Sequence, residues 1–150
     1  MLDRSMGVVR KLFTITPGEF SDLVLAQWYL LVALWTVRRR PRGELLRPLS
    51  SAPTGNGARD NARLERLALA VDRVARFGLF RPTCLVRAVA LERQIKRANA
   101  GAAVVRVGVA QVAGELLAHA WIELEGQVIG DEEVRVRRFT PLQDFSALAS

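Results

Sequence analysis

Apolar residues dominate the N-terminal third of the chain. The stretch from Leu23 to Val37 is apolar except at three positions, and Ser21 and Asp22 just before it are residue types that favour a helix N-cap. Three arginines follow it, which suits the negative end of a helix dipole. The pattern predicts a helix over about 21–40. Because nearly every face is apolar, we expect this helix to pack against the rest of the protein or a partner.

The length of the same run bears on a membrane location. At fifteen residues it is short for the hydrocarbon layer of a bilayer, which needs about 20. Membrane association through residues 21–40, with the arginines as a collar, is therefore the second interpretation. The first residues of the chain lack a long apolar run and a small-residue cleavage site, so we expect no signal peptide.

A stretch dense in Pro, Gly, Ser and Asn separates this helix from the rest of the chain. We place a linker at 49–59, an N-terminal helical segment at 1–48 and one further domain at 60–150. After the linker, apolar residues from Leu64 to Ala75 recur at three- and four-residue steps, which predicts an amphipathic helix.

Another helix is predicted from Thr83, a good N-cap, to about Ala98. Its buried stripe includes Ala88 and Leu91, and the sequence Asn-Ala-Gly ends it. Cys84 lies four residues before Ala88, so it shares the buried face in the first turn.

The last third of the chain alternates between apolar and polar residues. "AVVRVGVA" predicts one strand, and "LAHAWIEL" predicts another, with His119 and Trp121 on one face and Ala120 and Ile122 on the other. "EGQ" is a turn, after which residues 128–139 return as one or two strands. Helices followed by an antiparallel sheet predict an α+β fold.

Composition limits the chemistry. One cysteine excludes an internal disulfide and a Cys-rich metal site, and one histidine makes a zinc site unlike the common ones. We expect no metal and no cofactor, as the family resemblance described below also implies. The net charge of +7, with 20 Arg and 2 Lys, would suit an anionic partner such as nucleic acid or a membrane surface. The arginines are spread along the chain with few interleaved aromatics, which argues against a nucleic-acid module.

The single cysteine and the single histidine fit a nucleophile and its base. A thiol attacks as thiolate, which a helix N-terminus or a nearby imidazolium favours, and Cys84 is predicted at such an N-terminus. Free N–H groups of the first helical turn also bind an oxyanion. His119 would serve as the base, and a third group usually orients a catalytic imidazole. Asp131 is the best candidate for that third group.

Hairpin register decides whether Asp131 reaches His119. A three-residue loop after Leu124 places Asp131 diagonal to the histidine on the same face. A two-residue loop places Asp131 opposite Ala120, on the wrong face. The catalytic interpretation therefore predicts the longer loop or a bulge. The residues alone leave the alternative open, since a single Cys is most often a small core residue and a single His on a strand is most often structural.

Several motifs together resemble the leader peptidases of lasso-peptide biosynthesis. They are "TCLVRAVALERQIKR" around Cys84, "AHAWIELEGQVIGD" from His119 to Asp131, and "FTPL". In that family a Cys-Leu motif opens a helix, an Ala-His-Ala-Trp strand follows, and an Asp lies about a dozen residues beyond the His. The residue before that Asp is often Asn, whereas it is Gly130 here.

The resemblance implies a transglutaminase-like, papain-related core and a bacterial cytoplasmic enzyme. Cys84 would be the nucleophile, His119 the general base and then acid, and Asp131 the orienting group, with Trp121 as a candidate wall of the substrate cleft. The reaction would be cleavage of one peptide bond in a precursor peptide. The implied partners are the precursor, a separate leader-binding protein and an ATP-dependent cyclase.

Two rival interpretations remain. A transglutaminase-like acyltransferase would use the same thiol with an amine in place of water. An Arg-rich module binding nucleic acid or a membrane surface would carry an inert cysteine and would bind with strong salt dependence.

Overall fold

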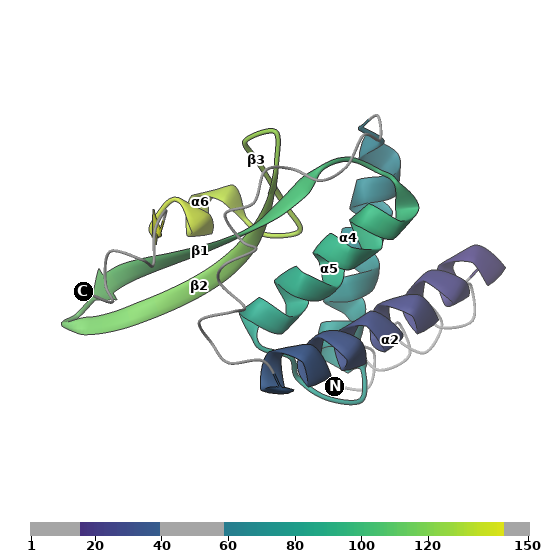
Figure 1. Ribbon diagram of the computed structural model, residues 1–150, viewed down its shortest axis with the longest axis horizontal. Coiled ribbons are helices and arrows are strands. Elements are labelled where there is room, and N and C mark those ends of the chain that lie inside the picture. The colour runs from purple at the N-terminus through teal and green to yellow at the C-terminus, as the bar shows by residue number, and fades with distance from the viewer. Residues whose placement is uncertain (1–15, 40–58, 143–150) are drawn as a thin grey trace, which may run out of the picture.

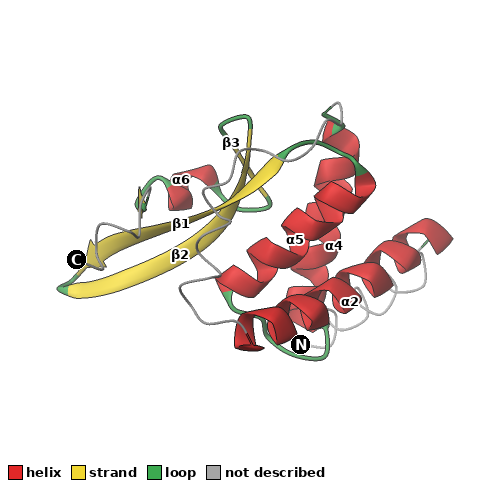
Figure 2. Ribbon diagram, viewed as in Figure 1, coloured by secondary structure: helices red, strands yellow, loops and turns green. Residues whose placement is uncertain are grey.

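The computed structural model describes residues 16–39 and 59–142 and has helices first and a sheet after them (Figures 1 and 2). The three long helices lie together on one side of a twisted antiparallel sheet, as the predicted α+β class requires. The elements are α2 (Pro17–Arg39), α4 (Asn61–Phe77), α5 (Cys84–Ala98), β1 (Ala103–Val112), β2 (Glu115–Leu124), β3 (Gln127–Ile129), α6 (Glu133–Val136) and β4 (Thr140–Pro141).

Helix α2 begins four residues earlier than predicted. Thr16 is its cap: the Thr16 Oγ1 accepts a hydrogen bond from the Glu19 N–H, and Glu19 Oε2 accepts one from the Thr16 N–H at 2.9 Å. This reciprocal pair is a capping box, and Pro17 suits the first helical position. The predicted N-cap at Ser21 is therefore wrong, because a stronger start signal precedes it.

One face of α2 packs against α4 and α5 through mostly small side chains, among them Ala26, Leu30 and Ala33. The opposite face leaves large apolar side chains exposed, including Trp28 and Trp35. By length and composition α2 could cross a membrane, a test that the core helix of a soluble protein also passes. Membrane association through this helix stays a prediction.

Helices α4 and α5 confirm the predicted periodicities. Asp60 caps α4 by accepting a hydrogen bond from the Arg63 N–H at 3.0 Å. Thr83 caps α5, and Asn99 ends it in the left-handed conformation. Their buried faces form the core together with α2 and β2.

The sheet has the strand order β3-β2-β1-β4. Its body is the long hairpin of β1 and β2, in which Ala103 pairs with Leu124 at one end and Val112 with Glu115 at the other. Ala120, Ile122 and Leu124 belong to the core, as the predicted alternation requires.

The segment after β3 differs from the prediction. Residues 133–136 form the short helix α6, whereas a strand was predicted across 128–139. The alternating Val134 and Val136 imitate a strand pattern, but the Glu132 carbonyl accepts hydrogen bonds from the N–H groups of Arg135 and Val136. Val136 is buried and Val134 is exposed, as one helical turn allows.

Most of the predicted linker at 49–59 lies outside the described residues, so the division into 1–48 and 60–150 stays a prediction. Arg59, its last residue, pairs with Glu125 at 3.4 Å and also contacts Gln127. The chain that leads into α4 is thereby tied to the turn between β2 and β3.

Candidate active site

Cys84 is the first residue of α5. Thr83 Oγ1 accepts a hydrogen bond from the Val86 N–H at 3.4 Å, and the Thr83 carbonyl accepts one from the Arg87 N–H at 3.0 Å. The N–H groups of Cys84 and Leu85 therefore have no acceptor inside the helix. The thiol is half-buried and packs against the core. The predicted place of Cys84 in the first helical turn is confirmed.

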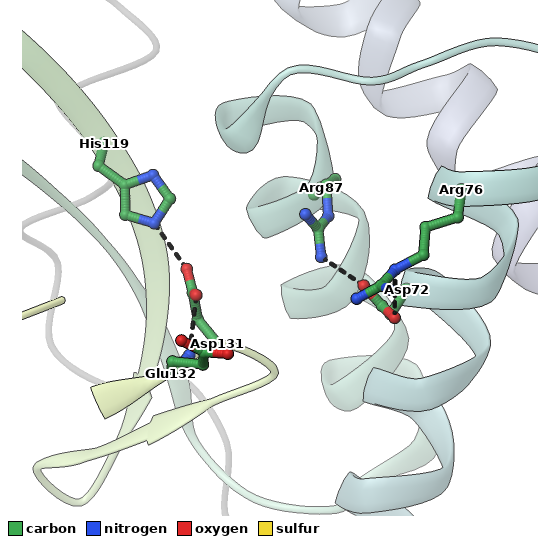
Figure 3. A network of polar contacts seen from close by, with 6 residues as sticks. All are labelled: Asp72, Arg76, Arg87, His119, Asp131 and Glu132. Carbon is green, nitrogen blue, oxygen red and sulfur yellow. Dashed lines mark hydrogen bonds and ion pairs between the residues drawn. The ribbon is translucent and has the colours of Figure 1, made fainter. Parts of the chain in front are cut away.

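The imidazole of His119 is held by three neighbours. Its ring stacks on Trp121 with centroids 6.2 Å apart, and Phe139 lies against it at 5.1 Å. Its Nε2 lies 2.6 Å from Oδ2 of Asp131, and the side chain is only 13% exposed. Because Asp131 occupies Nε2, Nδ1 is the nitrogen left for another partner (Figure 3).

The side chain of Trp121 stacks against the imidazole of His119. Its indole is 2% exposed, and Nε1 donates a hydrogen bond to Glu123 Oε1 at 2.9 Å. The ring passes over Gly108, the β1 residue paired with His119, where a Cβ would lie 2.8 Å from the indole Cη2. Glycine at that position makes room for the indole and so for the stack.

The hairpin before Asp131 is tighter than predicted. Leu124 pairs with Gln127, so the loop is the two residues Glu125 and Gly126, both with positive φ. Positive φ at both central positions is typical of a type I′ turn, the preferred link between twisted antiparallel strands. The predicted three-residue loop is wrong, and the paired ladder contains no bulge.

Asp131 reaches His119 because the chain leaves the ladder. Pairing stops at Ile129, and Gly130 takes the left-handed conformation with φ 73°. This turn at the end of β3 releases Asp131 from the register that would have set it opposite Ala120. Left-handed backbone is adopted most readily by Gly and next by Asn. Gly130 therefore suits the backbone conformation that places the carboxylate.

A second hydrogen bond and close packing fix Asp131. Its Oδ1 accepts a hydrogen bond from the Glu132 N–H at 2.8 Å, which leaves Oδ2 for the imidazole (Figure 3). A Cβ on Gly130 would lie 2.9 Å from Leu91 and 3.3 Å from Ala68. The end of β3 therefore rests directly on α4 and α5.

Cys84, His119 and Asp131 line one narrow cleft of about 30 Å³, which lies between the helices α4 and α5, the middle of β2 and the end of β3. In the described chain, β3 pairs only with Ile122–Leu124 of β2, so the β2 residues before Ile122 have no strand partner at the β3 edge. The open edge of β2 is thus where the three predicted residues come together.

Arg87 also lines this cleft and was not singled out from the sequence. It lies one helical turn after Cys84, and its Nη2 donates to Asp72 Oδ1 at 3.1 Å, while Asp72 also pairs with Arg76 at 3.0 Å (Figure 3). This shared carboxylate fixes the side chain of Arg87, which lines the same cleft as Cys84. The three-residue spacing from Cys84 was the available signal for Arg87, whereas the sequence of α4 does not mark Asp72 as its partner.

Within residues 16–39 and 59–142, no group of three or more His, Cys, Asp or Glu side chains is arranged to hold a metal ion.

Comparisons with known proteins bear on the family of the chain. No curated protein and no solved structure matches the chain. The family model described as the transglutaminase-like superfamily matches residues 27–144, which include most of α2 and every other element described. Members of that superfamily are generally cysteine-based enzymes and include peptidases and acyltransferases. The chain belongs to the transglutaminase-like superfamily.

Proposed function

We propose that the protein is a cysteine peptidase that removes the leader from a ribosomally made lasso-peptide precursor. The observation that carries the proposal is that Cys84, at the start of α5, lines the same cleft as the His119–Asp131 pair. A thiol at a helix N-terminus and an imidazole oriented by a carboxylate are the parts that acyl transfer needs. The sequence motifs around these residues support the leader peptidase among the reactions of the superfamily.

In the proposed mechanism His119 accepts the thiol proton at Nδ1, and the Cys84 sulfur attacks the carbonyl carbon of the scissile bond. The imidazolium then gives that proton to the leaving amine nitrogen as the C–N bond breaks, which leaves a thioester. Water attacks the thioester while His119 takes its proton, and the proton returns to the sulfur as the acid product leaves.

Asp131 and the start of α5 serve this sequence in different ways. Asp131 accepts a hydrogen bond from Nε2–H, which keeps the lone pair on Nδ1 and stabilises the imidazolium. The unpaired Cys84 N–H is a donor for the oxyanion that forms on attack. Trp121, beside the imidazole, forms part of the wall of the cleft that would hold the substrate.

The proposal includes partners and a location. A separate leader-binding protein would present the precursor, an ATP-dependent cyclase would use the released core peptide, and all would act in the bacterial cytoplasm. Nucleic acid has no part in it.

Mass spectrometry of the precursor, incubated with the full chain and the leader-binding protein, tests the proposal. We expect two fragments whose masses sum to the precursor plus one water, and no cleavage by Cys84→Ala. A primary amine added to the reaction distinguishes the peptidase from an acyltransferase, because an acyltransferase would join the acyl group to the amine and yield an amide. Predominant amide, or an intact precursor, would contradict the peptidase.

A further inference from the structure

A second, wider hollow lies among α2, α4 and α5 at the opposite end of α5 from Cys84. Its volume is about 320 Å³, and the residues that line it all come from these three helices. Figure 1 shows α2 on the side of α5 that faces away from the long β1–β2 hairpin, and α2 residues line this hollow but not the cleft that contains Cys84. This helical groove is thus separate from the cleft that holds Cys84 and His119.

Gln94 lines the helical groove and lacks the bonds that a buried amide needs. It is 3% exposed, and within the described chain neither its Nε2 nor its Oε1 has a hydrogen-bond partner. Buried polar atoms without partners are rare, because they lose their bonds to water and gain none in return. A primary amide with both its donor and its acceptor free is complementary to a peptide group, which offers one C=O and one N–H.

The charge of the groove favours an anion. Arg63, Arg66 and Arg97 line it, and among the described residues none of the three forms an ion pair with an Asp or Glu. Asp22 is the one carboxylate in the lining. Guanidinium groups bind carboxylates through two parallel hydrogen bonds, which makes arginine the usual partner for acidic side chains.

We propose that the helical groove binds an acidic peptide segment. The arginines bind its Asp or Glu side chains, and the Gln94 amide binds its main chain. The identity of that peptide as the precursor rests on the proposed function, whereas binding itself does not. Cys84 and Gln94 are ten residues apart on one helix, or about 15 Å. An extended substrate therefore needs at least about five residues between its acidic segment and the scissile bond.

Fluorescence anisotropy with the full-length Cys84→Ala variant measures binding without cleavage. The probe is a short fluorescein-labelled peptide of alternating Glu and Gly, and the same peptide with Gln in place of Glu is its control. We expect the Glu peptide to bind and the Gln peptide to bind at least about tenfold more weakly, since charge-assisted bonds are lost.

Variants of the groove locate that binding. Arg63→Ala and Arg97→Ala, both on exposed side chains, should each weaken binding about tenfold. Arg138→Ala removes the same charge from an exposed residue that does not line the groove, and it should not weaken binding. Gln94→Leu should also lose binding while its melting temperature stays equal or rises, because leucine removes the unpaired amide. Equal binding by the groove variants and Arg138→Ala would overturn the proposal. Failure of the Glu peptide to bind the Cys84→Ala protein would also overturn it. A Gln94→Leu variant with a lowered melting temperature would do the same, because that result is expected if the amide only holds water.

Cleavage assays separate this proposal from the peptidase. With both correct, Arg97→Ala cleaves the whole precursor more slowly but cleaves a short peptide around the scissile bond at the wild-type rate. Peptide binding without any cleavage of the precursor would support the groove proposal and contradict the peptidase proposal. Precursor cleavage that the groove variants leave unchanged would support the peptidase proposal and contradict the groove proposal.

Discussion

Helix α5 lines two different hollows, one near each of its ends. At the Cys84 end the cleft is narrow, and His119 and Asp131 are bonded to each other. At the Gln94 end the groove is about ten times larger, and the amide and three arginines have no partners among the described residues.

The two ends of α5 differ in whether their polar groups are already paired within the protein. Catalysis favours groups fixed before the substrate arrives, because no energy is then lost in arranging them during the reaction. Recognition leaves polar groups open, so that the ligand supplies the missing bonds. The paired end of α5 suits chemistry and the unpaired end suits binding, and changes confined to one end should leave the other intact.

The largest expected effect comes from removing either reacting group at the paired end. Cys84→Ala and His119→Ala should each lower precursor cleavage by at least about a thousandfold, since the nucleophile and its base act as a unit. Initial rates measured by mass spectrometry test this, with peptide binding at the groove as the control that should not change. Wild-type turnover by Cys84→Ala would refute the mechanism.

Loss of the orienting charge should have a smaller effect. Asp131→Asn keeps a hydrogen-bond acceptor for Nε2 but loses the charge that stabilises the imidazolium, so we expect cleavage to fall about a hundredfold. Glu132→Gln changes the charge of the next, exposed residue and should cleave normally. If the two variants cleaved equally well, Asp131 would have no part in orienting the base.

Gly130→Ala tests whether the left-handed turn places Asp131. The substitution adds about 1–2 kcal/mol of backbone strain and a contact of 2.9 Å with Leu91, so it should lower the melting temperature by several degrees and cleavage about tenfold. Gly114→Ala, also left-handed but in open space, is the matched control and should only lower stability. Unchanged cleavage by Gly130→Ala would show that Asp131 is positioned by other contacts.

The smallest effect is expected midway along α5. Partial burial raises the pKa of Glu92 above its usual 4.5, against the opposing charges of Lys96 and Arg93. The folded state then holds this proton more tightly than the unfolded state, so stability declines as pH rises from about 4.5 through the raised pKa. Glu92→Gln should be more stable than wild type at pH 7 and equal to it at low pH, by denaturant titration. A constant difference at every pH would exclude this cause.

Much of the helical part could be predicted because its signals are local. Thr83 and Asn99 bracket α5, and three- and four-residue apolar steps mark α4, so Cys84 could be placed in the first turn. The start of α2 was predicted four residues too late, because the Thr16–Glu19 capping box lies before the apolar run that marks the helix.

The sheet was harder, since its details depend on single backbone angles. Glu125 takes positive φ, which few residue types favour, so the two-residue loop had no strong signal in the sequence. His119 and Asp131 were predicted to pair, and they do, but through the turn at Gly130 rather than a longer loop. Gln94 could not be recognised from the sequence, because an amide on a helix reveals neither its burial nor its lack of partners.

The separate origins of the thiol and the imidazole have a consequence for partly folded molecules. His119 and Asp131 belong to one hairpin and can pair as soon as it forms, whereas Cys84 arrives only when α5 docks against the sheet. Local opening that releases α5 therefore parts the proposed nucleophile from its base. A peptidase built this way is inert in the very states that expose its own chain to cleavage, and is protected from digesting itself.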